Sequence, residues 1–220
     1  MTGAYLPVRI LTLKLLPNLS TDLLKTLKIR PENRSIGLIS TDCDDATYLA
    51  LDEATKVANV EVVYGRSLYA GASNASTRLA GEVIGILAGP TPSEVVSGLR
   101  GAEAFLKSGV GFQVACDTKD VVYLAHCVSR TGSYLSDAAG IPAGQPLAYL
   151  IAPPVEAVVG LDAALKAADV RLCTFYAPPT ETNFGGGLLT GSQSACQAAC
   201  DAFAEAVVQI ASHPEDLGGL

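Results

Sequence analysis

Three carboxylates stand close together near the start of the chain: Asp42, Asp44 and Asp45. They follow a short apolar run, Ile36–Ile39, and precede a stretch whose apolar residues have helical spacing. Carboxylates in a first helical turn cap backbone amides and favour the helix dipole, each by ~0.3–1 kcal/mol. The same cluster could bind a cation, either a metal or an ammonium group. Spacing leaves both interpretations open, but it excludes a calcium loop, whose glycine and distal glutamate are missing.

Two further motifs invite a chemical interpretation. Glu82 interrupts the apolar segment LAGEVIGILAG, so its carboxylate faces either solvent or a pore or ligand, because burying it unpaired is costly. The run Gly186–Ser192 has the glycine spacing of a phosphate loop but lacks the lysine before the serine, which excludes a nucleoside triphosphatase.

The histidines and cysteines suggest no active site. His126 lies in an apolar strand and reads as a packed side chain, and His213 lies near the C-terminus. Cys127, Cys196 and Cys200 could form a zinc site together with a histidine, but their spacing matches no strong zinc pattern. Because no nucleophile–base arrangement can be built, we expect no catalytic residues. The six cysteines show no framework spacing, and we expect reduced thiols.

Composition narrows the class of protein further. The net charge is −7 and the pI about 4.8, with no basic stripe, so we expect no nucleic-acid partner. The chain is 49% hydrophobic with a mean hydropathy of +0.33, yet no apolar run reaches the ~20 residues of a membrane span. The N-terminus does not resemble a signal peptide. Apolar surface of this amount is buried either in a packed core or partly between subunits.

The elements that would position the carboxylates recur along the chain. A strand at Ile36–Ile39, a helix with Ala46, Leu49, Ala50, Ala54 and Val57 on one face, and a strand at Val60–Tyr64 form one unit. Asp52–Val60 aligns with Asp162–Val170 at a constant offset of 110 residues (162 − 52). This period has the size of a small domain, so we predict two α/β copies in tandem, residues 1–112 and 113–220.

Each predicted copy begins with a strand and a short helix and ends with a longer helix. Predicted strands are Val8–Leu16, Val121–Val128 and Leu147–Ile151. Predicted helices are Thr21–Leu27 with Ser20 as its N-cap, Thr131–Ala139, Ser93–Leu106 and Ser192–Ile210. A flexible linker is predicted at Lys107–Asp117, with Phe112 and Val114 still packed. Long loops are predicted in equivalent places, Gly65–Thr77 and Tyr176–Gly187, and their recurrence favours a function.

Several segments resemble a known family, the L-type shell proteins of ethanolamine-utilisation bacterial microcompartments. The resemblance covers about residues 8 to 212 and departs mainly in the first fifteen residues, at Val110–Lys119 and after Ser212. The segments that carry it are SIGLISTDCDDATYLALDEATK, VEVVYGRSLYAGA, SRTGSYLS, AYLIAPPVEA and LLTGSQSACQAAC.

The resemblance implies a fold and an assembly. Each chain of that family has two tandem, circularly permuted shell domains of mixed α/β structure. Three chains form a flat, pseudo-hexameric homotrimer that tiles with other shell proteins into the shell of a cytoplasmic organelle. The two long loops would surround a gated central pore, for which the matching residues here are Tyr69, Gly71, Phe184 and Gly185.

The resemblance also implies a ligand, because members of that family bind ethanolamine in a small pore within each subunit. The matching residues are Asp44, Asp45, Glu82, Phe112, Thr182, Asn183 and Phe184. Carboxylates would pair with the ammonium group, and Phe112 would add a cation–π contact of ~0.5–2 kcal/mol. Ethanolamine would favour the closed pore. No cofactor is expected to be required, although some members are linked to zinc or cobalamin, for which no residues are assigned.

These observations leave three hypotheses. The leading one is a non-enzymatic shell protein with a gated pore that passes bulky molecules and retains a volatile aldehyde. The second is a soluble amine-sensing regulatory module that does not tile. The third is an enzyme acting on a small amine with Asp45 or Glu82 as the base, for which the residues give little support.

Overall fold

The computed structural model describes residues 2–67, 83–116, 121–178, 180 and 182–215. Its contacts divide the chain into two compact units. The first unit comprises Pro7–Gly111 and Thr131–Ala138, and the second comprises Met1–Leu6, Phe112–Arg130 and Ala139–Leu220. Each unit therefore takes a short segment from the other half of the sequence. The boundary between the copies at residues 112 and 113 stays a prediction.

The first unit contains a four-stranded antiparallel sheet with the strand order β1-β2-β4-β3. Its elements, in chain order, are β1 (Ile10–Leu16), α1 (Thr21–Thr26), β2 (Ser35–Thr41), α2 (Asp44–Val57), β3 (Glu61–Ser67), β4 (Val83–Gly89) and α3 (Pro92–Lys107). Ser20 caps α1 by accepting a hydrogen bond from the backbone N–H of Leu23, as predicted.

Helices α2 and α3 cover one face of this sheet, and two glycines let them approach it. A Cβ on Gly37 would lie 2.8 Å from side-chain carbons of Leu99 in α3, and one on Gly85 would lie 2.8 Å from Leu51 in α2. The α1 segment packs on the opposite face, where Leu24 joins a small core with Ile36.

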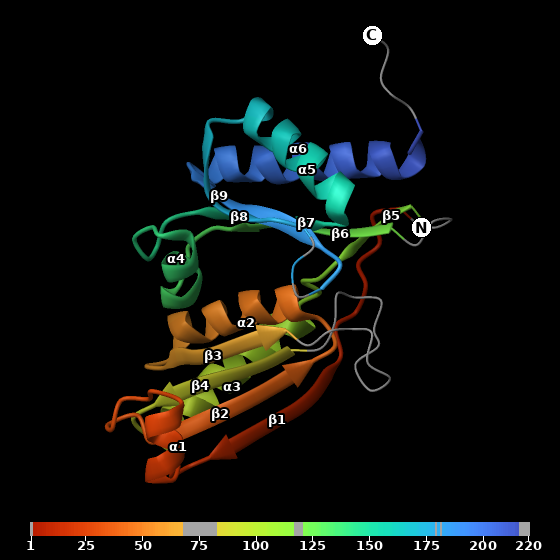
Figure 1. Cartoon of the computed structure of the whole chain (residues 1–220). Coiled ribbons are helices and arrows are strands. Elements are labelled where there is room, and N and C mark those ends of the chain that lie inside the picture. Colours follow the sequence, from red (N-terminus) through yellow and green to blue (C-terminus); the bar gives the residue numbers. More distant parts are fainter. Residues whose placement is uncertain (1, 68–82, 117–120, 179, 181, 216–220) are drawn as a thin grey trace. The chain divides into compact units, whose positions relative to one another are not determined.

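The second unit repeats this plan with one extra edge strand, in the order β5-β6-β7-β9-β8. Its elements are β5 (Gln113–Cys116), β6 (Val121–Val128), β7 (Leu147–Ala152), α5 (Pro154–Ala167), β8 (Val170–Tyr176), β9 (Gly185–Gly191) and α6 (Gln193–Ser212). Helices α5 and α6 lie on one face of the sheet (Figure 1), and Phe203 of α6 packs tightly against Gly160 of α5. The N-terminal segment pairs with β5, because Tyr5 bridges Gln113.

The tandem repeat is confirmed by the order of the elements. In both copies the second, third and fourth strands and the two longer helices come in the same order along the chain. The strands also pair with one another in the same order. Helices α2 and α5 both have 14 residues and start 110 residues apart (154 − 44). The short helix α4 (Ser133–Ala139) is the counterpart of α1, but its residues up to Ala138 belong to the first unit.

Three predicted boundaries are wrong. Gly65–Ser67 is not the start of a loop, because β3 continues to Ser67 by pairing with β4. The supposed linker contains β5, which is stabilised by pairing with β6. The loop Tyr176–Gly187 ends at Phe184, since Gly185 pairs with Ala152 as part of β9.

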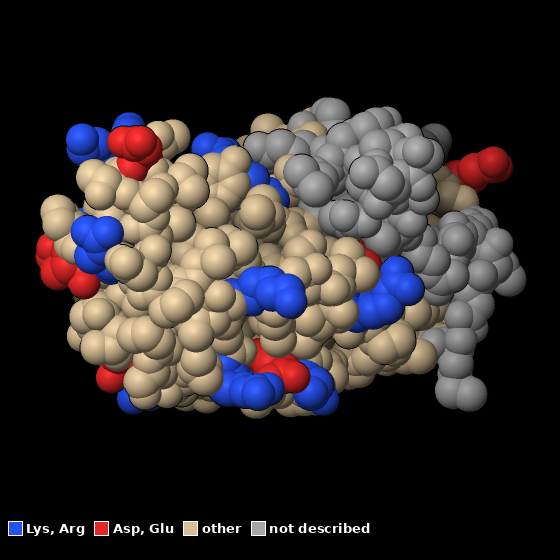
Figure 2. Space-filling model, turned by 90° about the horizontal axis from the view of Figure 1, so that it is seen from below, with Lys and Arg blue, Asp and Glu red and all other residues tan. Residues whose placement is uncertain are grey.

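The fold confirms the predicted mixed α/β class. In the described ranges, none of the helices combines the length and the apolar character that a bilayer crossing requires. Charged side chains on the face drawn in Figure 2 are scattered among uncharged residues and form no single basic patch.

Candidate functional site

The acidic pair Asp44 and Asp45 opens α2, and both residues are buried, with 4% and 7% of their surface exposed. Asp44 accepts a hydrogen bond of 2.6 Å from the hydroxyl of Ser67 through Oδ2, and one of 2.9 Å from the backbone N–H of Asp45 through Oδ1. The Ser67 hydroxyl lies 2.6 Å from the hydroxyl of Tyr48. A short polar chain therefore runs from Tyr48 through Ser67 to Asp44.

Burial dominates the electrostatics of this pair. It raises the pKa of Asp44 to about 6, although the hydrogen bond from Ser67 partly opposes the change. Burial also raises the pKa of the neighbouring Cys43 thiol, and the carboxylate of Asp45 adds to that effect. Negative charge is thus costly at the start of α2, so a cation placed there would be stabilised.

Asp42 has a different role from its two neighbours. Its Oδ1 accepts a 2.7 Å hydrogen bond from the backbone N–H of Arg9, and its Oδ2 lies 3.6 Å from Nε of the same arginine. This carboxylate therefore joins the end of β2 to the segment before β1. Asp42 thus makes a long-range structural contact besides its place next to Asp44 and Asp45 in the sequence.

The predicted aromatic residues lie in the second unit. Phe112 is fully buried, and its ring meets that of Phe184 edge to face with centroids 5.2 Å apart. Thr182 is buried in the same loop as Phe184, with its hydroxyl 3.2 Å from that of Thr180, and Asn183 is exposed. The predicted ethanolamine residues thus divide into an acidic pair in the first unit and an aromatic pair with Thr182 and Asn183 in the second.

Three predicted residues lie outside the described residues: Glu82, Tyr69 and Gly71. Gly185, predicted as a pore-loop residue, is buried at the start of β9. Its Cβ position would lie 2.7 Å from Pro178, so the strand packs closely on the loop that precedes it.

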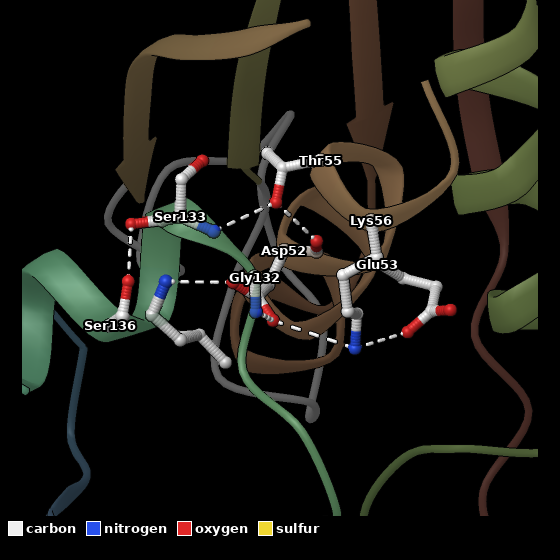
Figure 3. Close-up of polar contacts among 8 residues, drawn as sticks. Asp52, Glu53, Thr55, Lys56, Gly132, Ser133 and Ser136 are labelled. Atoms are coloured by element: carbon white, nitrogen blue, oxygen red, sulfur yellow. Dashed lines mark hydrogen bonds and ion pairs between the residues drawn. The ribbon is translucent and has the colours of Figure 1, made fainter. Parts of the chain in front are cut away.

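A second polar cluster, which the sequence did not single out as a site, surrounds Asp52 in the middle of α2 (Figure 3). The Asp52 side chain is 1% exposed. Its Oδ2 accepts a 2.8 Å hydrogen bond from the backbone N–H of Gly132, and its Oδ1 accepts one of 2.9 Å from Leu135. Lys56 approaches Oδ2 at 3.6 Å and also pairs with Glu53. Asp52 therefore caps the N-terminus of α4 from a distance of 80 residues in sequence.

Thr55 completes this contact. Its hydroxyl donates to the carbonyl oxygen of Asp52 at 2.7 Å and accepts from the backbone N–H of Ser133 at 3.1 Å. Gly132 is required here, because a Cβ would lie 2.2 Å from that hydroxyl and 2.6 Å from the Asp52 carbonyl oxygen. A sequence feature that could have indicated this contact is Gly132. It occupies the position just before α4, as the capping residue Ser20 occupies the position just before α1.

The cysteines form no reactive or metal-binding centre in the part of the chain that the structure describes. All six are free thiols, as predicted. Within the described ranges, no group of three histidine, cysteine or acidic side chains could hold a metal ion. Burial raises the pKa of the Cys196 and Cys200 thiols, which keeps them protonated and unreactive.

Comparison with known proteins agrees with the doubled fold. The family model described as the BMC domain matches residues 35–115. Two such α/β units in tandem, together with this match, place the chain in the class of bacterial microcompartment shell proteins, which are structural proteins and not enzymes.

Relatives across most of the chain define the family. The shell protein EutL of Clostridium perfringens is 64% identical over 205 residues, covering 93% of this chain and 94% of the relative. EutL of Escherichia coli is 55% identical and covers 92% of each. The crystal structure of the ethanolamine utilization protein EutL from Leptotrichia buccalis superposes with a TM-score of 0.94 at 61% identity, covering 98% of this chain and 100% of that one. The chain belongs to the EutL family, and its place is the microcompartment shell.

Proposed function

We propose that this chain is a shell protein of an ethanolamine-utilising microcompartment that works as a homotrimer with a gated central pore. The name of one relative supports a role in ethanolamine utilisation, because that relative is described as an ethanolamine utilization protein. The low share of charged residues, 17%, supports lateral packing with other shell proteins. The pore residues are those that the resemblance implies: Tyr69, Gly71, Phe184 and Gly185.

The ligand that we propose is ethanolamine, and the buried pair Asp44–Asp45 carries this part of the proposal. Ethanolamine is a cation at neutral pH, and its ammonium group would offset the burial cost that raises the pKa of Asp44 to about 6. The hydroxyl of Ser67 already orients one oxygen of Asp44, which leaves a fixed carboxylate for the ligand. Charge-assisted hydrogen bonds of this kind are about twice as strong as neutral ones.

The remaining residues of the proposed site rest on the resemblance. Phe112 would offer its ring face or edge to the cation, and Thr182 and Asn183 would offer partners for the ligand hydroxyl. Phe184 would hold the Phe112 ring through their edge-to-face contact, and Glu82 would add a second carboxylate. The proposal includes no required cofactor, and it assigns no residues to zinc or cobalamin.

Calorimetric titration with ethanolamine tests the acidic pair. Asp44→Asn and Asp45→Asn should each weaken binding by about tenfold or more, because each removes a charge-assisted hydrogen bond. Glu156→Gln is the matched control, since it removes one negative charge from the first turn of the equivalent helix α5. Unchanged affinity in both aspartate variants would contradict the site assignment.

Binding should also depend on pH in a definite direction. Because the pKa of Asp44 is about 6, this group is largely protonated at pH 5 and ionised at pH 7.5. Ethanolamine needs the carboxylate, so its affinity should rise between these two values, and the rise should disappear in Asp44→Asn. An affinity that is flat or falls with pH would count against Asp44 as a ligand.

Electron microscopy of the concentrated protein tests the shell and pore. We expect flat sheets of triangular or pseudo-hexagonal tiles. Adding ethanolamine should increase the fraction of particles with a closed central pore, because a ligand shifts an equilibrium only toward the state that it binds more tightly. Discrete particles that never tile would instead support an amine-sensing module.

A further inference from the structure

Tyr48, in the second turn of α2, is joined to the acidic pair by two hydrogen bonds in series. Its hydroxyl lies 2.6 Å from that of Ser67, and the Ser67 hydroxyl donates to Oδ2 of Asp44 at 2.6 Å. An ionised carboxylate can only accept hydrogen bonds, and serine has a single hydroxyl proton, which is committed to Asp44. The hydroxyl of Tyr48 must therefore donate to Ser67, so the donors all point toward Asp44.

The protonation states of the two ends agree with this direction. Burial raises the pKa of Tyr48 above its ordinary value, and the nearby carboxylates add to the effect, so the phenol keeps its proton at neutral pH. Asp44, with a pKa of about 6, is mostly ionised at pH 7.5. The other titratable or charged groups around this chain of hydrogen bonds are Asp42, Cys43 and Asp45 near the start of α2, Arg66 on β3 and Tyr134 on α4.

Packing on both sides places the ring of Tyr48. The Tyr134 ring lies 6.2 Å from it, tilted by 44°. A Cβ on Gly65 would lie 3.3 Å from the Tyr48 ring and 2.8 Å from the Tyr134 hydroxyl oxygen, so this glycine makes room for both rings. Because side chains alternate along a strand, Gly65 and Ser67 lie on the same face of β3. One face of β3 thus accommodates the ring and supplies the serine that its hydroxyl reaches.

The second copy shows that the fold does not need these groups. At the offset of 110 residues it has no carboxylate or hydroxyl at any of the three positions. The residues there are Pro154, Val158 and Ala177. Helix α5 nevertheless has the same 14 residues as α2, and β8 pairs with β9 as β3 pairs with β4. The three polar groups are present together in one copy and absent together from the other, which indicates a task specific to the first copy.

That task concerns the carboxylate of Asp44, which is held at both oxygens. Its Oδ1 accepts from the backbone N–H of Asp45 at 2.9 Å and its Oδ2 accepts from Ser67. These bonds use one acceptor site on each oxygen, and a carboxylate oxygen has about two. A donor behind the serine hydroxyl fixes its rotation and polarises it, which strengthens the hydrogen bond to the carboxylate.

We propose that Tyr48 is a positioning residue of the amine site: acting through Ser67, its hydroxyl holds the carboxylate of Asp44 in the orientation that receives the ammonium group of the ligand. This inference rests on the ethanolamine site proposed above and adds to it a residue that acts through another. Asp44 supplies the charge, Ser67 fixes one of its oxygens, and Tyr48 fixes the serine hydroxyl.

Calorimetric titration with ethanolamine at pH 7.5 tests the series of contacts. Ser67→Ala should weaken binding about tenfold, because Asp44 loses a charge-assisted hydrogen bond. Tyr48→Phe keeps the ring and removes only the hydroxyl, and it should weaken binding about three- to fivefold. The double variant should bind as Ser67→Ala does, because a residue that acts only through Ser67 has no further effect once that hydroxyl is gone.

The pH dependence of binding distinguishes positioning from packing. The hydrogen bond from Ser67 favours the ionised form of Asp44, so its loss raises the pKa of that group further. The rise of affinity with pH should therefore move to higher pH in Ser67→Ala, and by a smaller amount in Tyr48→Phe. A tyrosine that only filled space would leave the midpoint of this rise where it is in the native chain.

Tyr64→Phe is the matched control, since it removes a tyrosine hydroxyl from β3 at a position that is 39% exposed. Its affinity and midpoint should equal those of the native chain. Equal effects of Tyr64→Phe and Tyr48→Phe would overturn the inference.

The remaining outcomes separate this inference from the proposal beneath it. A native chain that does not bind ethanolamine, or an Asp44→Asn variant that binds it normally, would overturn the site and the positioning role together. Binding that is lost in Asp44→Asn but unchanged in Tyr48→Phe would overturn the positioning role alone. So would losses that multiply in the double variant, because Tyr48 would then act independently of Ser67.

Discussion

Helices α2 and α5 are copies of one element, yet the central aspartate is buried in α2 and exposed in α5. Asp52 and Asp162 both lie four residues before a lysine and both pair with it. The side chain of Asp52 is 1% exposed and accepts two backbone hydrogen bonds from α4, whereas that of Asp162 is 62% exposed. The same aspartate–lysine spacing therefore belongs to a buried cap in one copy and to a surface ion pair in the other.

The short helices differ in a complementary way. Helix α1 is capped by the hydroxyl of its own Ser20, while α4 is preceded by Gly132 and takes its cap from Asp52. Gly132 has no side chain that could cap its own helix, but it allows α2 to approach closely. The comparison teaches that the role of a repeated residue is set by the segment packed against it, and not by its own helix.

Replacing the two aspartates should give the largest difference in stability between the two copies. Asp52→Ala should lower the free energy of unfolding by about 3 kcal/mol or more, because two backbone N–H groups of α4 and Lys56 lose their partner in a buried place. Asp162→Ala should change it by less than about 0.5 kcal/mol, since exposed ion pairs contribute little. Urea denaturation at one fixed protein concentration measures both. Similar losses in the two variants would show that burial does not distinguish them.

Substitutions before the short helices should have a smaller effect. Gly132→Ala should cost about 2 kcal/mol, because its Cβ collides with the Thr55 hydroxyl and the Asp52 carbonyl oxygen. Ser20→Gly, which gives α1 the residue of the second copy, should cost only a few tenths of a kcal/mol. Thermal unfolding compares the two. A Gly132→Ala protein as stable as the native one would mean that α4 does not need its close approach to α2.

Helices α2 and α5 also differ at their first two residues, which are Asp44 and Asp45 in α2 and Pro154 and Val155 in α5. Burial raises the pKa of Asp44 above its value in the unfolded chain, so the folded state binds the proton more tightly. Stability should therefore fall as pH rises from about 4 through about 6.

Asp44→Asn removes this group and should stabilise the protein at pH 7.5 by on the order of 1–2 kcal/mol, with the gain vanishing near pH 4. Denaturation curves at several pH values measure the difference. Glu156→Gln, at the start of α5, serves as the control. A variant that is less stable than the native chain at pH 7.5 would contradict a burial cost at Asp44.

Several features could be predicted from residues alone because they depend on short-range patterns. Alternation and helical spacing predicted the strand at Val121–Val128 and the helix α2. Ser20 identified the start of α1, and the offset of 110 residues identified the tandem copies. The spacing of the carboxylates Asp42, Asp44 and Asp45 predicts either helix capping or a cation site, and the cation site stays a prediction.

Long-range packing decided the rest. The strand β5 forms within a glycine-rich stretch because β6 offers a pairing edge, which spacing along the chain does not encode. Asp42 bonds Arg9, 33 residues away, and its spacing in the chain does not reveal that contact.

The sequence by itself determined the repeated elements, the acidic start of α2 and the shell-protein resemblance. Only the tertiary structure decided that Asp52 is buried while Asp162 is exposed. The physical reason is that the cap on α4 needs a carboxylate held within hydrogen-bond distance of backbone N–H groups 80 residues away. That distance is set by packing at Gly132, and the helix sequences DEATK and DAALK do not reveal it.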